Sequence, residues 1–266
     1  YVVGTACSRA YPNLKSPFNI SPRGIEYMDN AAERWNGSLK IISEALEGPE
    51  TVQIRSLAGA FEGDPRAIGR VGPFSFAEEG TYTIRIKNPE TGIDAVSNPI
   101  EVTETEPEMK LFWGDLHSQT YFSDGLRCPE ELYSFARDEA FLDIFALADH
   151  SDALVGGIWD YLVGTTNLFN DPGRFVTLVG YEWTANDIGH RNVYFPGPSG
   201  PVISHTRPDG DTLEKLFELA RQEGALLIPH HTSNVTMGVK WDLGHEPVHE
   251  RLVEIYSLWG SAEHYG

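Results

Sequence analysis

Cysteine, basic side chains and long apolar runs are all scarce in this sequence, and each scarcity excludes a class of protein. The 266 residues include only Cys7 and Cys128, too few and too far apart for a disulfide framework or a cysteine-bound zinc site. No apolar run of about 18 residues occurs, so we expect no membrane span. The sequence has 20 lysines and arginines but 39 acidic residues, which gives a formal charge of −19. This charge argues against nucleic-acid binding, which needs a basic surface.

Histidine is absent from residues 1–107, which are rich in proline and glycine. Short runs of alternating polar and apolar residues lie between the turn-forming residues, a pattern that predicts antiparallel strands. The expected strands are residues 38–42, 51–55, 81–86 and 99–102, and a short helix could form at 24–35. We predict a small β-sandwich-like domain that either supports its neighbour or binds a substrate such as a carbohydrate.

An acidic linker that contains Pro107 spans residues 103–109, and the pattern changes from residue 110 on. Apolar strand-like runs then alternate with helical patterns, which implies a parallel sheet, most simply closed as a barrel. We therefore predict two domains, residues 1–107 and 108–266. The expected strands are 142–147, 175–181, 191–195, 225–228 and 252–256; helices are expected from Pro129 and from Asp211, and a helix or long loop at 153–168.

Several apolar runs of the second domain end in histidine or carboxylate side chains. Because a barrel gathers the carboxyl ends of its strands at one rim, we expect these side chains to converge. Imidazole and carboxylate groups are ligands for zinc, iron or manganese. The candidate metal ligands are His117, Gln119, Asp124, His150, Glu182, His190 and His230.

Some of these candidates have a second interpretation. Asp124 lies in a Ser-Asp-Gly sequence, which is also typical of an Asx turn. His190 could support a ligand instead of being one. Glu182 closes an apolar strand, where a carboxylate needs a partner, and it could bridge two metals. Of the other histidines, His264 adjoins a polar cluster, whereas His205, His245 and His249 lie in loop-like sequence and are expected at the surface.

Five motifs together resemble the PHP (polymerase and histidinol phosphatase) family, and in particular a group that carries an N-terminal β domain. They are Asp115–Thr120, Ser123–Gly125, Leu147–Asp152, Gly180–Glu182 and Pro229–His230, and the likeness covers residues 108–266. The resemblance implies an α/β fold, a distorted (β/α)7 TIM-like barrel of the PHP type. It also implies two or three divalent metal ions and phosphoesterase activity.

The sequence departs from the family pattern at two places. Gln119 stands where the first motif usually has a second histidine, so one metal is expected to be bound loosely or to be missing. The closing Asp-x-His motif is not found before Gly266, so we expect the barrel to be incomplete at its C-terminus.

These observations predict a divalent-metal-dependent hydrolase, a phosphoesterase in which a metal-bridging hydroxide attacks phosphorus next to Glu182. His231, Arg191 or Lys240 would hold a phosphoryl oxygen or protonate the leaving group. Two other functions stay open: a catalytically idle module that binds metal or a ligand, and a metallohydrolase acting on a non-phosphate bond. The expected partner is a small-molecule phosphate ester, and the sequence decides neither compartment nor oligomeric state.

Overall fold

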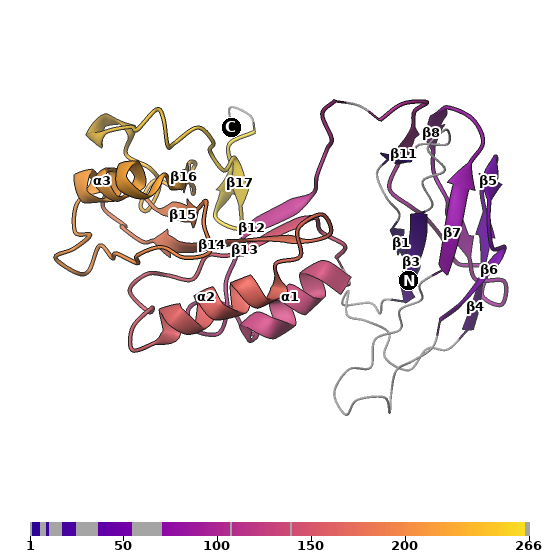
Figure 1. The fold of residues 1–266 in the computed structure, drawn as a ribbon, viewed down its shortest axis with the longest axis horizontal. Coiled ribbons are helices and arrows are strands. Elements are labelled where there is room, and N and C mark those ends of the chain that lie inside the picture. Colours follow the sequence, from indigo (N-terminus) through magenta and orange to yellow (C-terminus); the bar gives the residue numbers. More distant parts are fainter. Residues whose placement is uncertain are drawn as a thin grey trace. The chain divides into compact units, whose positions relative to one another are not determined.

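The computed structural model describes residues 2–5, 9–10, 18–24, 37–54, 71–106, 108–138 and 140–263 (Figure 1). The chain divides into two compact units, Tyr1–Leu111 and Phe112–Gly266, whereas the sequence pattern placed the boundary after residue 107. His264 and all but the first residue of the helix expected at 24–35 lie outside the described residues.

The described residues of the first unit form short strands. They are β1 (Val2–Thr5), β2 (Arg9–Ala10), β3 (Phe18–Gly24), β4 (Gly37–Ile42), β5 (Leu46–Glu47), β6 (Thr51–Ile54), β7 (Val71–Phe76), β8 (Gly80–Tyr82), β9 (Arg85–Lys87), β10 (Asp94–Val96) and β11 (Ile100–Val102). In the described part they form three sheets, with strand orders β1-β3-β7-β5, β10-β9-β4-β6 and β2-β11-β8. The strand expected at 81–86 is divided, because β8 pairs with β11 while β9 pairs with β4 and β10.

Alternating residues of the first unit face a common core. Leu39 and Ile41 of β4 lie beside Val52 and Ile54 of β6, and all four are buried. Their neighbours Lys40 and Thr51 point to solvent, as expected for strands with one buried face.

The second unit contains one five-stranded sheet, three α-helices and a hairpin among its described residues (Figure 1). The elements are β12 (Gly114–Ser118), α1 (Pro129–Asp138), β13 (Ile144–Leu147), α2 (Ile158–Phe169), β14 (Val176–Trp183), β15 (Arg191–Phe195), α3 (Leu213–Glu223), β16 (Leu226–Pro229), a 3-10 turn (Trp241–Leu243), β17 (Tyr256–Ser257) and β18 (Gly260–Ser261). The sheet order is β12-β13-β14-β15-β16. None of the described helices is long and apolar enough to cross a membrane.

The prediction of a (β/α)7 TIM-like barrel is wrong. Strands β12, β13 and β14 run parallel, but β15 is antiparallel to both β14 and β16, so the sheet is mixed and open. Parallel neighbours need a crossover of about a dozen residues, and only residues 184–190 connect β14 to β15. The expected strand at 252–256 is also largely missing: β17 begins at Tyr256, and the segment before it contacts β16 through the Glu254 amide and the Pro229 carbonyl, 3.0 Å apart.

Capping residues account for the ends of α3. The Thr212 side chain accepts a hydrogen bond from the Lys215 amide, so Thr212 is the N-cap and the helix begins at Leu213, two residues after the expected start at Asp211. Gly224 ends the helix with φ 67°, a left-handed conformation that glycine adopts without strain. The ambiguous segment 153–168 contains α2, which begins at Ile158.

The two faces of the five-stranded sheet differ in what covers them. Odd-numbered residues such as Val179 and Tyr181 of β14 pack with α1, α2 and α3 in the main core. Tyr194 and Ile228 belong to a smaller cluster on the opposite face. Because side chains alternate along a strand, Glu182 continues the even-numbered row of β14 and emerges on the face away from the helices.

Gly180 in β14 pairs with Tyr194 of β15 and lies directly beneath its ring. A Cβ atom at position 180 would lie 2.4 Å from Tyr194 Cδ1 and 2.5 Å from the Val193 carbonyl oxygen. We therefore expect Gly180→Ala to lower the free energy of unfolding by roughly 1–3 kcal/mol, measured by urea denaturation.

Gly164 in α2 provides a matched control for this substitution. A Cβ there meets no atom of the described residues within 4 Å, apart from its own helix. Gly164→Ala should raise the free energy of unfolding by roughly 0.5–1 kcal/mol, because alanine favours helix. Equal effects at the two glycines would contradict the packing described here.

Candidate metal centre

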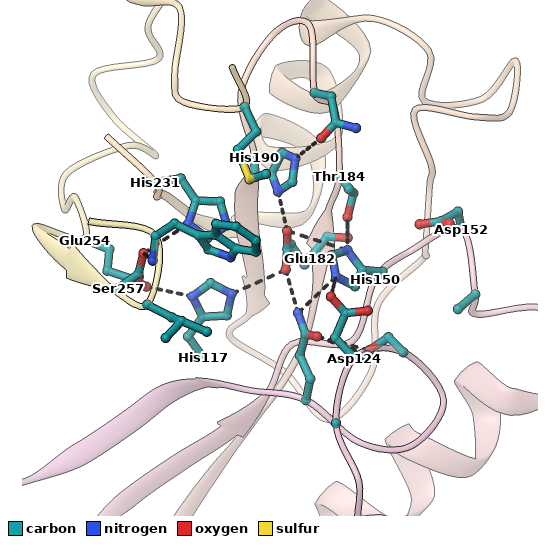
Figure 2. Close-up of a pocket in the computed structure, with 18 of the residues that line it drawn as sticks. His117, Asp124, His150, Asp152, Glu182, Thr184, His190, His231, Glu254 and Ser257 are labelled. Atoms are coloured by element: carbon teal, nitrogen blue, oxygen red, sulfur yellow. Dashed lines mark hydrogen bonds and ion pairs between the residues drawn. The ribbon is translucent and has the colours of Figure 1, made fainter. Parts of the chain in front are cut away.

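The Glu182 carboxylate lies at the centre of a cluster of histidines, as Figure 2 shows. It sits at the carboxyl end of β14 and is 1% exposed. Its Oε1 lies 2.7 Å from His190 Nδ1, 3.1 Å from His230 Nε2 and 3.7 Å from His150 Nδ1. Its Oε2 lies 3.3 Å from His117 Nε2. Four histidines from separate strand ends therefore surround one carboxylate.

Two of these imidazoles, together with that of His231, lie close enough to Glu182 to share one cation with it. Ligand atoms of Glu182, His190, His230 and His231 all lie within 4.8 Å of one another. His230 follows β16 and is fully buried, and its Nε2 makes no hydrogen bond of suitable geometry within the described part of the chain. A buried nitrogen without a hydrogen bond is unfavourable unless another group satisfies it. The arrangement therefore fits a metal ion bound by three imidazoles and a carboxylate.

His231 reaches this group through an unusual backbone conformation. Its φ of 56° lies in the left-handed region, which is uncommon for residues other than glycine. Adjacent residues in an extended chain point to opposite sides, but the rings of His230 and His231 lie 4.4 Å apart. The turn after β16 therefore brings both imidazoles to the same site.

His117 connects two carboxylates. Its Nδ1 lies 2.7 Å from Glu254 Oε2, while its Nε2 faces Glu182. Glu254 belongs to the predicted strand 252–256, yet it was not predicted as a site residue. Its position after an apolar pair, as with Glu182, is the only signal that sequence offered.

His150, Gln119 and Asp124 form the other side of the cluster. His150 Nδ1 lies 2.5 Å from Thr184 Oγ1, and its Nε2 lies 3.4 Å from Asp124 Oδ2. Gln119 donates from Nε2 to Glu182 Oε2 over 2.8 Å. Its Oε1 accepts from the Asp124 amide over 3.2 Å. Gln119 thus contacts Glu182 as a hydrogen-bond donor.

Asp149, next to His150, holds the loop that carries these residues. Its Oδ1 accepts hydrogen bonds from the amide and hydroxyl of Thr120, both over 2.9 Å, and from the Ser123 hydroxyl over 2.6 Å. Burial raises the pKa of Asp149, and these hydrogen bonds oppose that shift. The loop between Gln119 and Asp124 is therefore fixed to the end of β13.

Charge is distributed unevenly among the buried groups. Burial would raise the pKa of Glu182, but its close contacts with the imidazoles of His117, His190 and His230 hold it well below the ordinary value of 4.5. Burial would likewise lower the pKa of His117, but its bonds to Glu182 and Glu254 raise it to about 9. Burial lowers the pKa of His230, and burial with nearby imidazoles lowers that of His231 to about 4. Without metal, these shifts favour the charged form of His117 and the neutral forms of His230 and His231.

The metal-free protein should lose stability as the pH rises from 6.5 towards 9. The folded-state pKa of His117 lies above its ordinary value of 6.5, so its stabilising contribution is complete below 6.5 and disappears as the pH passes about 9. We expect the melting temperature of EDTA-treated wild type to fall across this window more than that of His117→Asn. Parallel declines in both proteins, followed by circular dichroism, would contradict this assignment.

A cavity of about 1210 Å³ opens beside the cluster. Its lining includes His117, His150, Glu182, His190 and His231, so these side chains face a space that a substrate can enter. Residues not foreseen from the sequence also line it: Thr184, Asn186, Glu254, Ser257 and Trp259.

The structure does not bring Arg191 into this cavity. Arg191 begins β15 on the face opposite Glu182, and its Nε donates to Glu250 Oε1 over 2.5 Å. Both side chains are fully buried. The expected catalytic role of Arg191 therefore has no geometric basis here. Lys240 also lies elsewhere, with its Nζ 3.1 Å from the Val235 carbonyl.

The three histidines expected at the surface lie outside the cluster. His205 pairs with Asp187 over 3.0 Å and is partly buried. His245 is exposed and contacts Glu250, whereas His249 is partly buried and contacts the Ala225 carbonyl over 2.8 Å.

Comparison with known proteins finds similarity to uncharacterized proteins. The chain is 28% identical to a protein of Chlamydia pneumoniae over 193 residues, 30% identical to one of Chlamydia muridarum over 193 residues, and 28% identical to one of Chlamydia trachomatis over 194 residues. Each match covers 71% of this chain but 31% of the relative, so the chain spans about a third of these proteins. No solved structure gives a significant match.

Residues 129–256 match the model of a family described as a protein of unknown function (DUF3604). The matched region includes His150, Glu182, His190 and His230, and it begins after His117. The similarity thus includes most of the histidine cluster and assigns no activity to it.

Proposed function

We propose that this chain is a divalent-metal-dependent hydrolase that acts on a phosphate ester of a small molecule. The observation that supports it is the buried Glu182 carboxylate within reach of four histidines, at the edge of an open cavity. The resemblance of five sequence motifs to the PHP family is a second support. These motifs contain residues of the site, and this support does not depend on a barrel fold.

The residues that would hold a first ion are Glu182, His190, His230 and His231. His117, His150 and Asp124 offer further donors for a second ion, and the mixture of imidazole and carboxylate suits zinc, manganese or iron. A bound divalent ion would lower the pKa of a water molecule and neutralise charge on phosphoryl oxygens.

Other residues of the chain hold these donors in place. Glu254 contacts His117 Nδ1, which directs Nε2 towards Glu182. Thr184 contacts His150 Nδ1 in the same manner, and Asn186 Oδ1 lies 2.8 Å from His190 Nε2. Such partners fix the orientation and protonation of an imidazole, and their loss typically weakens metal binding.

Removal and return of metal tests the proposal directly. Protein purified without a polyhistidine tag and stripped with EDTA should lose hydrolysis of p-nitrophenyl phosphate esters. Addition of manganese, zinc or iron should restore it, with bound metal measured by elemental analysis. Turnover that persists in the stripped protein would contradict a metal-dependent mechanism.

A catalytically idle metal-binding module is the alternative, and Gln119 favours it. Its amide donates to Glu182 Oε2, so this oxygen already has a hydrogen-bond partner. The alternative predicts bound metal without turnover of phosphomonoesters, phosphodiesters, amides or lactones. Turnover of an amide or lactone alone would instead indicate a metallohydrolase of a non-phosphate bond.

A further inference from the structure

One wall of the cavity is a short hairpin that carries three large apolar side chains. The hairpin consists of β17 and β18, and its Tyr256, Leu258 and Trp259 all line the cavity. Their exposed fractions are 66%, 93% and 55%. Adjacent exposed apolar side chains often mark a binding surface, because water is released when a ligand covers them. We call these three residues the apolar wall.

The apolar wall is held next to the candidate metal ligands. Ser257, between Tyr256 and Leu258, faces His231 (Figure 2), and its Oγ lies 3.2 Å from His231 Nδ1. The same oxygen accepts a hydrogen bond from the Trp259 amide over 3.1 Å. The Trp259 ring lies edge-on to His231, with centroids 6.3 Å apart and planes at 76°. A ligand at the histidine cluster therefore meets the wall directly.

A close approach of backbone secures the hairpin on its other side. Gly260 has φ 141°, and a Cβ there would lie 3.1 Å from the Ser233 hydroxyl, in the loop after β16. The hairpin backbone thus lies close to the loop that follows His231.

Apart from the histidines, all the titratable side chains with a charge at neutral pH that line the cavity in the described part of the chain are acidic. Asp115, Asp124, Asp152 and Glu254 line it with Glu182, and none of its lining residues in the described part of the chain is lysine or arginine. Carboxylates at this density repel anionic groups of a ligand. A polyphosphate or a doubly charged monoester would find no lysine or arginine here and only His117 as a basic group between two carboxylates, whereas a singly charged diester experiences less repulsion.

Building on the proposed function, we propose that the substrate is a phosphodiester with an aromatic or bulky apolar group that packs on Tyr256, Leu258 and Trp259. Its hydrolysis forms a bond between phosphorus and the water oxygen and breaks the bond between phosphorus and one ester oxygen. A proton passes to that oxygen, and the products are a phosphomonoester and an alcohol.

Three esters with the same leaving group distinguish the effect of substrate charge on turnover from the effect of contact with the apolar wall. They are p-nitrophenyl phosphate, methyl p-nitrophenyl phosphate and bis(p-nitrophenyl) phosphate, each tested with the manganese-loaded chain. We expect kcat/KM to increase in that order, with at least about tenfold between the monoester and the diaryl ester. Equal or faster turnover of the monoester would overturn this inference and leave the hydrolase in place. No turnover of any of the three would overturn both.

Variants of the apolar wall test its contribution. Leu258→Ser and Trp259→Ser change side chains that are more than half exposed, so we expect little effect on folding. Each should lower the ratio of kcat/KM for the diaryl ester to that for the methyl ester by about tenfold, and both should weaken binding of diphenyl phosphate, measured by calorimetry. Leu168→Ser, at a 78% exposed position of α2, is the matched control and should leave the ratio and the binding constant as in wild type. Unchanged values in the wall variants would overturn the assignment.

Discussion

Glu182→Gln should abolish metal binding and ester hydrolysis together. Glutamine keeps the size and shape of the side chain but removes the negative charge that His190, His230 and His117 all face. The carboxylate is ionised at any ordinary pH, because its pKa is held well below 4.5. A neutral amide cannot balance a divalent cation inside a buried cluster. We expect metal affinity to fall by at least about 100-fold, the upper end for loss of a supporting partner.

Competition with a chromogenic chelator and elemental analysis would measure this loss. Glu218→Gln, on the exposed face of α3, is the matched control and should bind metal as wild type does. Circular dichroism of both proteins in EDTA would show that the variant is folded. A folded Glu182→Gln protein with wild-type metal content and turnover would refute the candidate centre. Wild-type metal content with lost turnover would restrict Glu182 to a role in the reaction itself.

Arg191→Met should strongly destabilise the fold without any change in the metal centre. The substitution leaves the fully buried Glu250 carboxylate without its cation. Removing one member of a buried ion pair typically costs about 3–5 kcal/mol, because the remaining charge is uncompensated. We expect a loss of this size in the free energy of unfolding, measured by urea denaturation at neutral pH.

Two comparisons make this prediction specific. The double variant Arg191→Met with Glu250→Leu should recover most of the loss, since it removes both charges. Lys215→Met removes the exposed pair with Asp211 and should cost less than about 1 kcal/mol. If Arg191 were instead catalytic, Arg191→Met would lose kcat at nearly unchanged stability.

The sequence was most informative where side-chain type and local pattern carry the information. His150, Glu182 and His230 follow apolar strand-like runs, and the structure brings all three to one edge of the sheet. Alternation along β14 also indicates that Glu182 and Tyr181 point to opposite faces. The expected role of Arg191 did not take into account the face of β15 on which the residue lies, and that face is opposite to Glu182.

The direction of strands is where the sequence misled. Apolar runs and helical patterns alternate as in a barrel, but nothing in the periodicity of β15 distinguishes a parallel from an antiparallel neighbour. The short connection at 184–190 does distinguish them, and it places β15 antiparallel.

By itself, the sequence determined which side chains can bind a metal, the acidic net charge and the position of the candidate ligands at strand ends, because these follow from residue type and local order. It also determined the two faces of each strand, because side chains alternate with a period of two residues. Only the tertiary structure decided that the sheet is mixed and open, that Glu254 contacts His117 across 137 positions, and that Arg191 meets Glu250 across 59 positions. Such contacts depend on how distant segments pack, and local sequence periodicity does not encode them.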